Sequence, residues 1–216
     1  MIDDSDDLRS LDAVFQPDPR SGVHSIVEPR TLAVHRADVA KLVLHDGVPE
    51  DIRIQFLTAC NLMLYSWFVY RFANVGELHA IATLEFALRE RFDVDPSARP
   101  ALKSMLKCAV DMGLLCDSGL REYQRRVDAV RRDADARAQW PEELQRLCGA
   151  PPIRPKPDAR AAVKRLCTSI PALRNTLAHG SSYLWTEGCL RVEICADLIN
   201  QLFSRPTTDE DVGGAA

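Results

Sequence analysis

The sequence predicts an all-α protein, and three observations lead to that fold class. Of the 216 residues, 46% are hydrophobic, so the chain can bury a substantial core. Only 10 residues are glycine, and Leu, Ala and Arg are spread evenly along the chain, a composition that favours helices. No run of alternating apolar and polar residues is long enough to require a sheet.

Residues 1–48 are predicted to precede the helical bundle. The first seven positions include four aspartates, and Pro17, Pro19 and Pro29 follow, which indicates that residues 1–30 form a mobile lead-in outside the core. Apolar residues at positions 39, 42, 43 and 44 predict a short helix within 31–48, before Gly47.

The first long helix is predicted at about 50–71, where residues 54–70 include no charged side chain. Seventeen uncharged residues lie at the lower limit for a membrane span. However, polar side chains within this segment would each need a partner in lipid: Gln55, Thr58, Asn61 and Ser66. We therefore expect no membrane span, but a helix buried nearly all round, with a second subunit as one candidate for its cover.

Two further helices are predicted at 75–92 and 100–115, separated by a loop that contains Asp93, Asp95 and Pro96. The first carries an apolar stripe of Leu78, Ile81, Leu88 and Phe92. At about 100° per residue, Glu85 lies roughly 40° from Ile81 and therefore within this stripe. Its carboxylate needs a cationic or hydrogen-bonding partner there.

Residues 119–157 are predicted to form a charged insertion. Residues 119–147 indicate a projecting, mostly solvated helix that is broken near Trp140 and Pro141, and four prolines in 149–157 indicate a stiff linker. The arginines of this segment offer a contact for RNA or for a protein partner. Aspartates at 128, 133 and 135 are interleaved with them, so a self-compensating solvated face is the simpler interpretation.

A helix at about 159–179, with Asp158 as its N-cap, is predicted to carry the candidate site. Pro171 is expected to kink or restart this helix, with Ser169 as a candidate second cap, and Gly180 to end it. Its buried stripe is predicted to comprise Val163, Leu166, Cys167, Ile170 and Leu177. A last helix follows at 188–204, before a tail at 205–216 that we expect to be disordered.

The candidate site is the sequence Arg-Asn-Thr-Leu-Ala-His-Gly at 174–180, because a fixed guanidinium and a titratable imidazole are the pair that phosphate chemistry needs. On an ideal helix, His179 points roughly 140° away from Arg174, so one chain does not bring both to one phosphate. Distortion at Pro171, unwinding at Gly180, or a cleft shared by two chains would resolve this, and we favour the last two together. Asn175, one turn before His179, is placed to orient the ring or a phosphate, or is simply solvated.

Glu85 and Arg174 are predicted to pair across the bundle. Each is a charged side chain on the apolar stripe of a different helix, and an ion pair between the two gives each charge the partner it needs. A purely structural ion pair is the alternative to a role in chemistry. His179 likewise has a simpler interpretation, as a histidine favoured at a helix C-terminus by the macrodipole.

Other classes of function are disfavoured by the motifs that are missing. The seven cysteines form no C-x-x-C pair and no signal peptide is evident, so we expect reduced thiols and a cytoplasmic protein. The histidines have no ligand-spaced His or Cys neighbour, and no phosphate-binding glycine loop, G-x-S-x-G or H-E-x-x-H is present, so we expect no metal and no cofactor. The net charge of −4 gives little evidence for or against an RNA partner.

The motif at 174–180 resembles the R-x(4–6)-H signature of HEPN domains (higher eukaryotes and prokaryotes nucleotide-binding), including the polar residue after the arginine. The stretch AIATLEFALRERF at 80–92 is similar to the HEPN helix that carries an acidic residue. The resemblance covers about 50–115 and 158–204. It implies a HEPN-like four- to five-helix bundle at 49–204, with 119–157 as a charged helical insertion, and a homodimer in which two motifs line a cleft.

Many HEPN proteins are metal-independent endoribonucleases, frequently toxins or defence effectors. The resemblance implies that Arg174 holds the scissile phosphate, that His179 moves the proton, and that Asn175 and Glu85 support them. Attack by the ribose 2′-hydroxyl would then leave a 2′,3′-cyclic phosphate. Other HEPN proteins are non-catalytic nucleotide- or protein-binding modules, for example partners of a nucleotidyltransferase-type antitoxin, and this alternative remains open.

Overall fold

The computed structural model describes residues 7–22, 30–148, 158–180 and 189–204, and within them the chain is helical and contains no strand. The predicted all-α class is therefore confirmed for this part of the chain. In the described ranges, 3-10 turns accompany the α-helices at Pro19–Gly22 (η2) and at Asp117–Gly119 (η3). The α-helices are α1 (Leu32–Val39), α2 (Glu50–Tyr65), α3 (Phe72–Arg91), α4 (Leu102–Asp111), α5 (Arg121–Ala138), α6 (Glu142–Cys148), α7 (Ala161–Ala178) and α8 (Leu190–Phe203).

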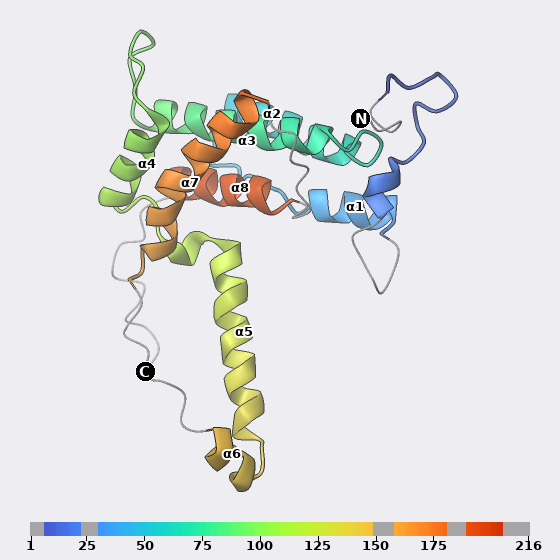
Figure 1. Cartoon of the computed structure of the whole chain (residues 1–216). Coiled ribbons are helices and arrows are strands. Elements are labelled where there is room, and N and C mark those ends of the chain that lie inside the picture. Colours follow the sequence, from blue (N-terminus) through green and yellow to red (C-terminus); the bar gives the residue numbers. More distant parts are fainter. Residues whose placement is uncertain (1–6, 23–29, 149–157, 181–188, 205–216) are drawn as a thin grey trace.

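Helix α3 lies at the centre of the bundle (Figure 1), in contact with α2, α8, α7 and α4. Its buried residues include small and large side chains, Ala80, Leu84 and Ala87 among them, so neighbours pack on more than one of its faces. Gly76 allows α2 to approach closely, because a Cβ atom there would lie 2.9 Å from the Met63 sulfur and 3.2 Å from the Ala59 carbonyl oxygen.

Residues 18–21 pack against the turn between α2 and α3, so the predicted mobile lead-in is wrong for these residues. Asp18 is buried, and its carboxylate accepts the N–H of Tyr70 at 3.1 Å and pairs with the guanidinium of Arg20 at 2.8 Å. The Ser21 hydroxyl donates to the Trp67 carbonyl at 3.0 Å. These contacts satisfy backbone groups outside any helix, which explains why α2 ends at Tyr65 and not at position 71 as predicted.

The segment that follows α1 also belongs to the core. The short helix predicted within 31–48 is present as α1, which ends at Val39. The extended stretch after it buries Leu42, Leu44 and Val48 against the bundle. Residues from before position 49 therefore complete the core that the sequence placed at 49–204.

Helix α2 is buried on one face only within the single chain, and cover of its outer face by a second subunit stays a prediction. Its inner face holds Ile52, Phe56, Ala59, Cys60 and Met63. On its outer face, Ile54, Leu57 and Tyr65 are 56%, 60% and 52% exposed. Among the described residues, no helix combines the length and the apolar character that a membrane crossing requires.

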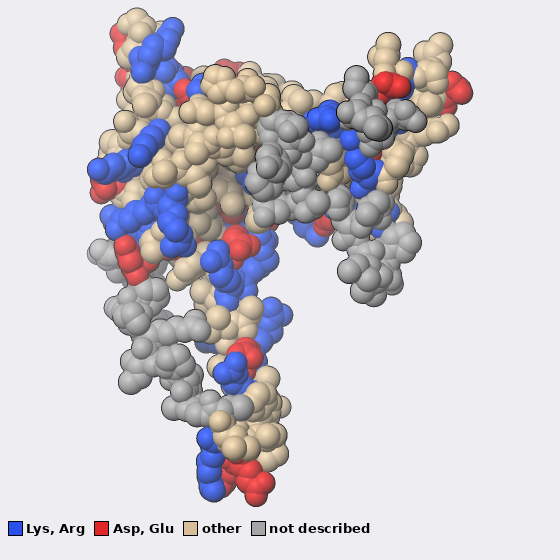
Figure 2. Space-filling model, viewed as in Figure 1, with Lys and Arg blue, Asp and Glu red and all other residues tan. Residues whose placement is uncertain are grey.

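Helices α5 and α6 project away from the bundle as an arm (Figure 1), as the charged insertion was predicted to do. No residue of α5 is buried, and α5 ends at Ala138, before Trp140 and Pro141. Basic and acidic side chains are interleaved along the arm (Figure 2), with ion pairs such as Arg137–Asp133 between them. The predicted linker at 149–157 and tail at 205–216 lie outside the described residues.

Candidate functional site

The helix that carries the candidate motif is fixed at its beginning by a residue from elsewhere in the chain. Asp117, in η3, is only 2% exposed, and its carboxylate accepts the N–H groups of Ala162 and Val163 at 2.8 and 2.9 Å. The predicted N-cap, Asp158, instead accepts the N–H of Arg160 and pairs with Lys164 on the surface. Asp117 thus satisfies two of the N–H groups that the first turn leaves free.

Helix α7 then continues through Pro171 without a break, so the predicted restart at Ser169 does not occur. Its side chains Val163, Cys167, Ile170 and Leu177 are buried as predicted, and Leu166 is partly buried. The helix ends at Ala178 with His179 as its C-cap, and Gly180 adopts a left-handed φ of 83°, as predicted for the residue that stops the helix.

The predicted contact between Glu85 on α3 and Arg174 on α7 is present, with 3.3 Å between Oε2 and Nε. The expectation that both charges are buried is wrong: the Arg174 side chain is 45% exposed and that of Glu85 is 24% exposed. The pair lies at the edge of the α3–α7 contact. The carboxylate contacts the Nε side of the guanidinium, so the terminal nitrogens of Arg174 remain open to a ligand.

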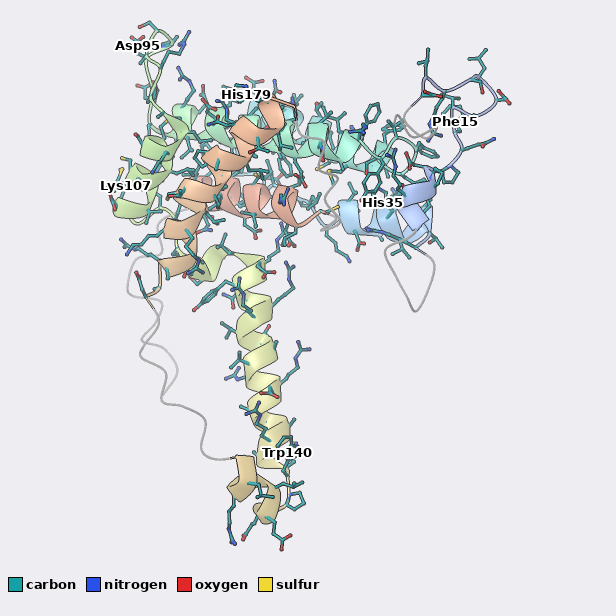
Figure 3. All side chains as sticks on the ribbon, in the orientation of Figure 1. Phe15, His35, Asp95, Lys107, Trp140 and His179 are labelled. Atoms are coloured by element: carbon teal, nitrogen blue, oxygen red, sulfur yellow. The ribbon has the colours of Figure 1, made fainter. Side chains whose placement is uncertain are left out.

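His179 and Asn175 are exposed, and within the described residues neither side chain has a hydrogen bond or an ion pair. His179 lies at the end of α7, on the outside of the bundle (Figure 3). Helix α7 is continuous from Arg174 to Ala178 and has His179 as its C-cap, so the two side chains leave it in directions close to the roughly 140° of an ideal helix. Of the three ways to bring the two groups together, a break at Pro171 is not seen. The helix does end at Gly180, and a cleft shared by two chains stays a prediction.

Unpaired basic side chains also lie on the surface of α4 and α7. Lys103 and Lys107 on α4 and Arg165 on α7 are exposed and form no ion pair within the described residues. Figure 2 shows lysines and arginines over this side of the molecule, where α4 packs on α7. The surface beside the motif helix therefore offers three unpaired positive charges, with acidic residues among them, although the chain as a whole has a net charge of −4.

Three buried carboxylates that sequence reasoning missed hold the helices around the site. Glu77 on α3 pairs with Arg191 on α8 at 3.0 Å, and Asp197 on α8 pairs with Arg121 at the base of α5 at 2.6 Å. Asp117, which caps α7, is the third buried carboxylate. Asp197 could have been found from the sequence in the same way as Glu85, because each is an acidic residue within an apolar run, but this pattern does not identify the residue that pairs with it.

Six cysteine side chains are described, all as free thiols. Cys60, Cys167 and Cys195 are buried and pack as small apolar residues. Burial raises the pKa of Cys60 and Cys189 to about 11 and that of Cys195 to about 12, which keeps these thiols protonated and unreactive at neutral pH.

No group of three or more His, Cys, Asp or Glu side chains in the described ranges is arranged to hold a metal ion. In comparisons with known proteins, no family model matches the sequence, and no curated protein and no solved structure is significantly similar to the chain.

Proposed function

We propose that the protein is a metal-independent endoribonuclease that uses a HEPN-like R-x4-H motif, with Arg174 binding the scissile phosphate and His179 transferring protons. The observation that carries this proposal is the exposure of both groups on one helix. A guanidinium anchored through Nε leaves its terminal nitrogens available to phosphate oxygens. The imidazole of His179 is open to solvent and therefore accessible to a substrate.

Glu85 acts in this proposal as a positioning residue. An arginine that is free to rotate loses side-chain entropy when it binds a phosphate, and an ion pair on its Nε side restricts that freedom beforehand. Because the pair is partly exposed, Glu85 does not remove Arg174 from solvent.

The active species is a homodimer in which Arg174 of one chain and His179 of the other face the same phosphate. This arrangement follows from the direction of the two side chains on α7, which differs by roughly 140°. The exposed basic residues Lys103, Lys107 and Arg165 would hold the RNA backbone on either side of the cleft.

The reaction needs only groups of the protein and the substrate. His179 takes the proton of a ribose 2′-hydroxyl, and the 2′-oxygen attacks the adjacent phosphorus while Arg174 stabilises the charge on the non-bridging oxygens. The bond between phosphorus and the 5′-oxygen breaks, and the 5′-oxygen leaves with a proton from solvent. The products are a 2′,3′-cyclic phosphate and a 5′-hydroxyl, and DNA, which lacks the nucleophile, is not cut.

One observation favours a second candidate, a HEPN-like module that binds a nucleotide or a partner protein, such as a nucleotidyltransferase-type antitoxin, without chemistry. Within one chain, Arg174 and His179 are solvated separately and do not converge. In the absence of a dimer, the two groups would serve only as separate contacts for a ligand or partner.

The test is incubation of the purified protein with end-labelled single-stranded RNA in EDTA, beside Arg174→Ala, His179→Ala and a matched surface variant, Arg132→Ala on the arm. We expect cleavage by the wild type and by Arg132→Ala, with 2′,3′-cyclic phosphate ends, and at least a hundredfold loss in the other two variants. An RNA with a 2′-deoxy substitution at the cleaved position should resist.

A mixture of Arg174→Ala and His179→Ala tests the shared cleft, because a mixed dimer retains one intact pair. Activity regained on mixing supports the two-chain site. Equal background in all variants would contradict the ribonuclease, and nucleotide binding that is lost in Arg174→Ala would then favour the second candidate.

A further inference from the structure

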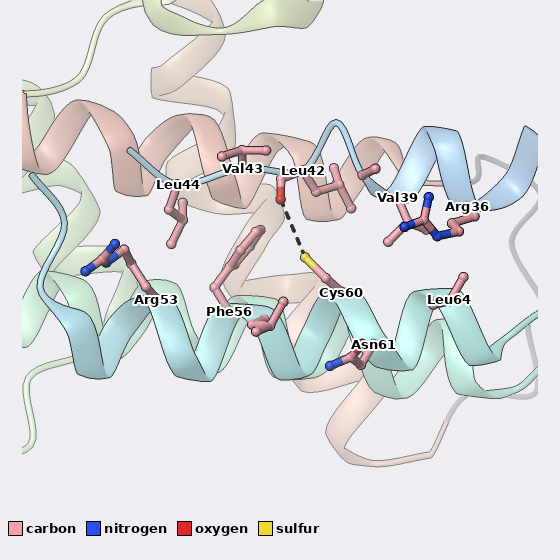
Figure 4. Close-up of a pocket in the computed structure, with 12 residues that line it drawn as sticks. Arg36, Val39, Leu42, Val43, Leu44, Arg53, Phe56, Cys60, Asn61 and Leu64 are labelled. Carbon is pink, nitrogen blue, oxygen red and sulfur yellow. Dashed lines mark hydrogen bonds between the residues drawn. The ribbon is translucent and has the colours of Figure 1, made fainter. Parts of the chain in front are cut away.

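A groove between the 36–44 segment and α2 has no role in the function proposed above. Its volume is about 450 Å³, within the range of small-molecule sites. Leu42, Phe56 and Cys60 are buried beneath it, and Val43 and Leu57, each 60% exposed, form its rim. Figure 4 shows the groove running along α2, with Arg53 at one end and Arg36 at the other.

The groove is closed at its floor, where the Cys60 thiol donates to the Leu42 carbonyl at 3.7 Å (Figure 4). An occupant therefore lies over Leu42, Phe56 and Cys60 and does not pass between α2 and the segment before it. An unbranched hydrocarbon chain is the shape that fits, since it presents only methylene groups to the aliphatic lining.

The two ends of the groove differ in charge. Arg53 is neutralised by Asp46, with 3.0 Å between Nη1 and Oδ1. Arg36 is exposed and has no ion pair or side-chain hydrogen bond among the described residues. The Arg36 end therefore carries an uncompensated positive charge beside an apolar channel, which is complementary to an anionic group on an apolar tail.

We propose that this groove binds a single-chain amphiphilic carboxylate of the medium-chain alkanoate type. The alkyl chain lies over Phe56 and Leu42, and the carboxylate accepts hydrogen bonds from Arg36. The groove is separate from the R-x4-H motif. Its lining comes from the 36–44 segment and α2, whereas the Glu85–Arg174 pair joins α3 and α7.

Titration calorimetry with sodium octanoate, 1-octanol and octylammonium chloride tests this proposal on the full chain. We expect saturable one-to-one binding of octanoate, weaker binding of octanol, and none of octylammonium. Arg36→Met keeps an apolar stem and removes the charge, so it should weaken octanoate binding about tenfold or more, which corresponds to a lost charge-assisted hydrogen bond. Arg132→Met, on the arm, is the matched control and should bind as the wild type does.

Leu57→Asp places a charge on the exposed rim, where it does not disturb folding, and should weaken octanoate and octanol alike. Light scattering on the same samples measures the oligomeric state and tests whether a second copy of the chain covers the groove. If the wild type is a dimer that Leu57→Asp dissociates, a second copy occupies the groove and the proposal is overturned. Absence of saturable octanoate binding, equal binding of octylammonium, or unchanged affinity in Arg36→Met would overturn it as well.

Discussion

The carboxylate of Asp117 accepts the N–H of Val163 at 2.9 Å across 46 positions of the sequence. Through this bond and its counterpart to Ala162, a buried residue of η3 sets where the motif helix begins. The direction in which Arg174 and His179 point is thus determined in part about three turns before Arg174, by a carboxylate at the helix N-terminus.

Replacing Asp117 with alanine should destabilise the protein by roughly 2–3 kcal/mol, because two buried N–H groups lose a charged acceptor. Asp117→Asn keeps one carbonyl acceptor and should lose roughly 1 kcal/mol. Urea unfolding measures both changes, and hydrogen exchange should become faster at Ala162 and Val163 in the alanine variant. A loss of less than about 0.5 kcal/mol in Asp117→Ala would show that water replaces the cap.

The glutamates at positions 77 and 85 allow a matched comparison on one helix. Both pair with arginine, but Glu77 is buried and Glu85 is not. Glu77→Gln should cost roughly 3 kcal/mol, because it replaces the buried carboxylate that pairs with Arg191 by a neutral amide. Glu85→Gln should cost less than about 1 kcal/mol. Chemical denaturation of both variants checks the order, and equal losses would contradict it.

Arg121→Met should make stability depend on pH through Asp197. Burial raises the pKa of Asp197, while hydrogen bonds and charge from Arg121 oppose the rise. Because the pKa of Asp197 is higher in the folded state than in the unfolded state, its contribution to the free energy of unfolding is complete below the unfolded-state pKa of 3.8. That contribution is lost as the pH rises through the folded-state pKa. Without Arg121 that loss is larger, so we expect a deficit of roughly 2 kcal/mol at pH 7 that shrinks in acid.

The control for this prediction is Asp197→Asn, which has no charge to compensate. Adding Arg121→Met to Asp197→Asn should cost less at pH 7 than Arg121→Met does alone, and the remaining cost comes from the lost contact of Arg121 with Glu193. A deficit of Arg121→Met that stays constant between pH 4 and pH 7 would contradict the role assigned to Asp197.

His35 should destabilise the protein in mild acid. Its ring is buried against Trp67 with Nε2 at 2.8 Å from the Met63 carbonyl oxygen, and burial, aided by Arg30, lowers its pKa from 6.5. Because the pKa of His35 is lower in the folded state than in the unfolded state, its contribution to the free energy of unfolding is complete above the unfolded-state pKa. That contribution is lost as the pH falls through the folded-state pKa. We expect the free energy of unfolding to fall between pH 7 and pH 5 more steeply in the wild type than in His35→Gln.

His179→Gln is the comparison for this measurement, since His179 is exposed. This side chain makes no hydrogen bond or ion pair within the described residues, so a change seen in His35→Gln and not in His179→Gln is due to the buried ring. If His35→Gln and the wild type lose stability in parallel, protonation of His35 does not drive the acid loss.

Local sequence patterns were sufficient for most of the helices. The charged arm, its break near Pro141 and the end of α7 at Gly180 were all predicted, because helical periodicity, a missing N–H and a left-handed φ are properties of a few adjacent residues. The contact between Glu85 and Arg174 was also predictable, since two charges on apolar stripes require partners.

Only the tertiary structure decided how far each charge is buried and which groups act on each helix end. Arg174 lies on the predicted stripe but is exposed, because the stripe faces α3 only as far as the edge of the contact between the two helices. Asp117 caps α7, and Asp18 binds the turn after α2, from distant positions that no local pattern links to them. Helical periodicity depends on residues that are neighbours in sequence, so the sequence by itself determined the helices. The burial of a charge and the capping of a helix depend on residues that are neighbours in space, so the tertiary structure determined what the charged residues contact.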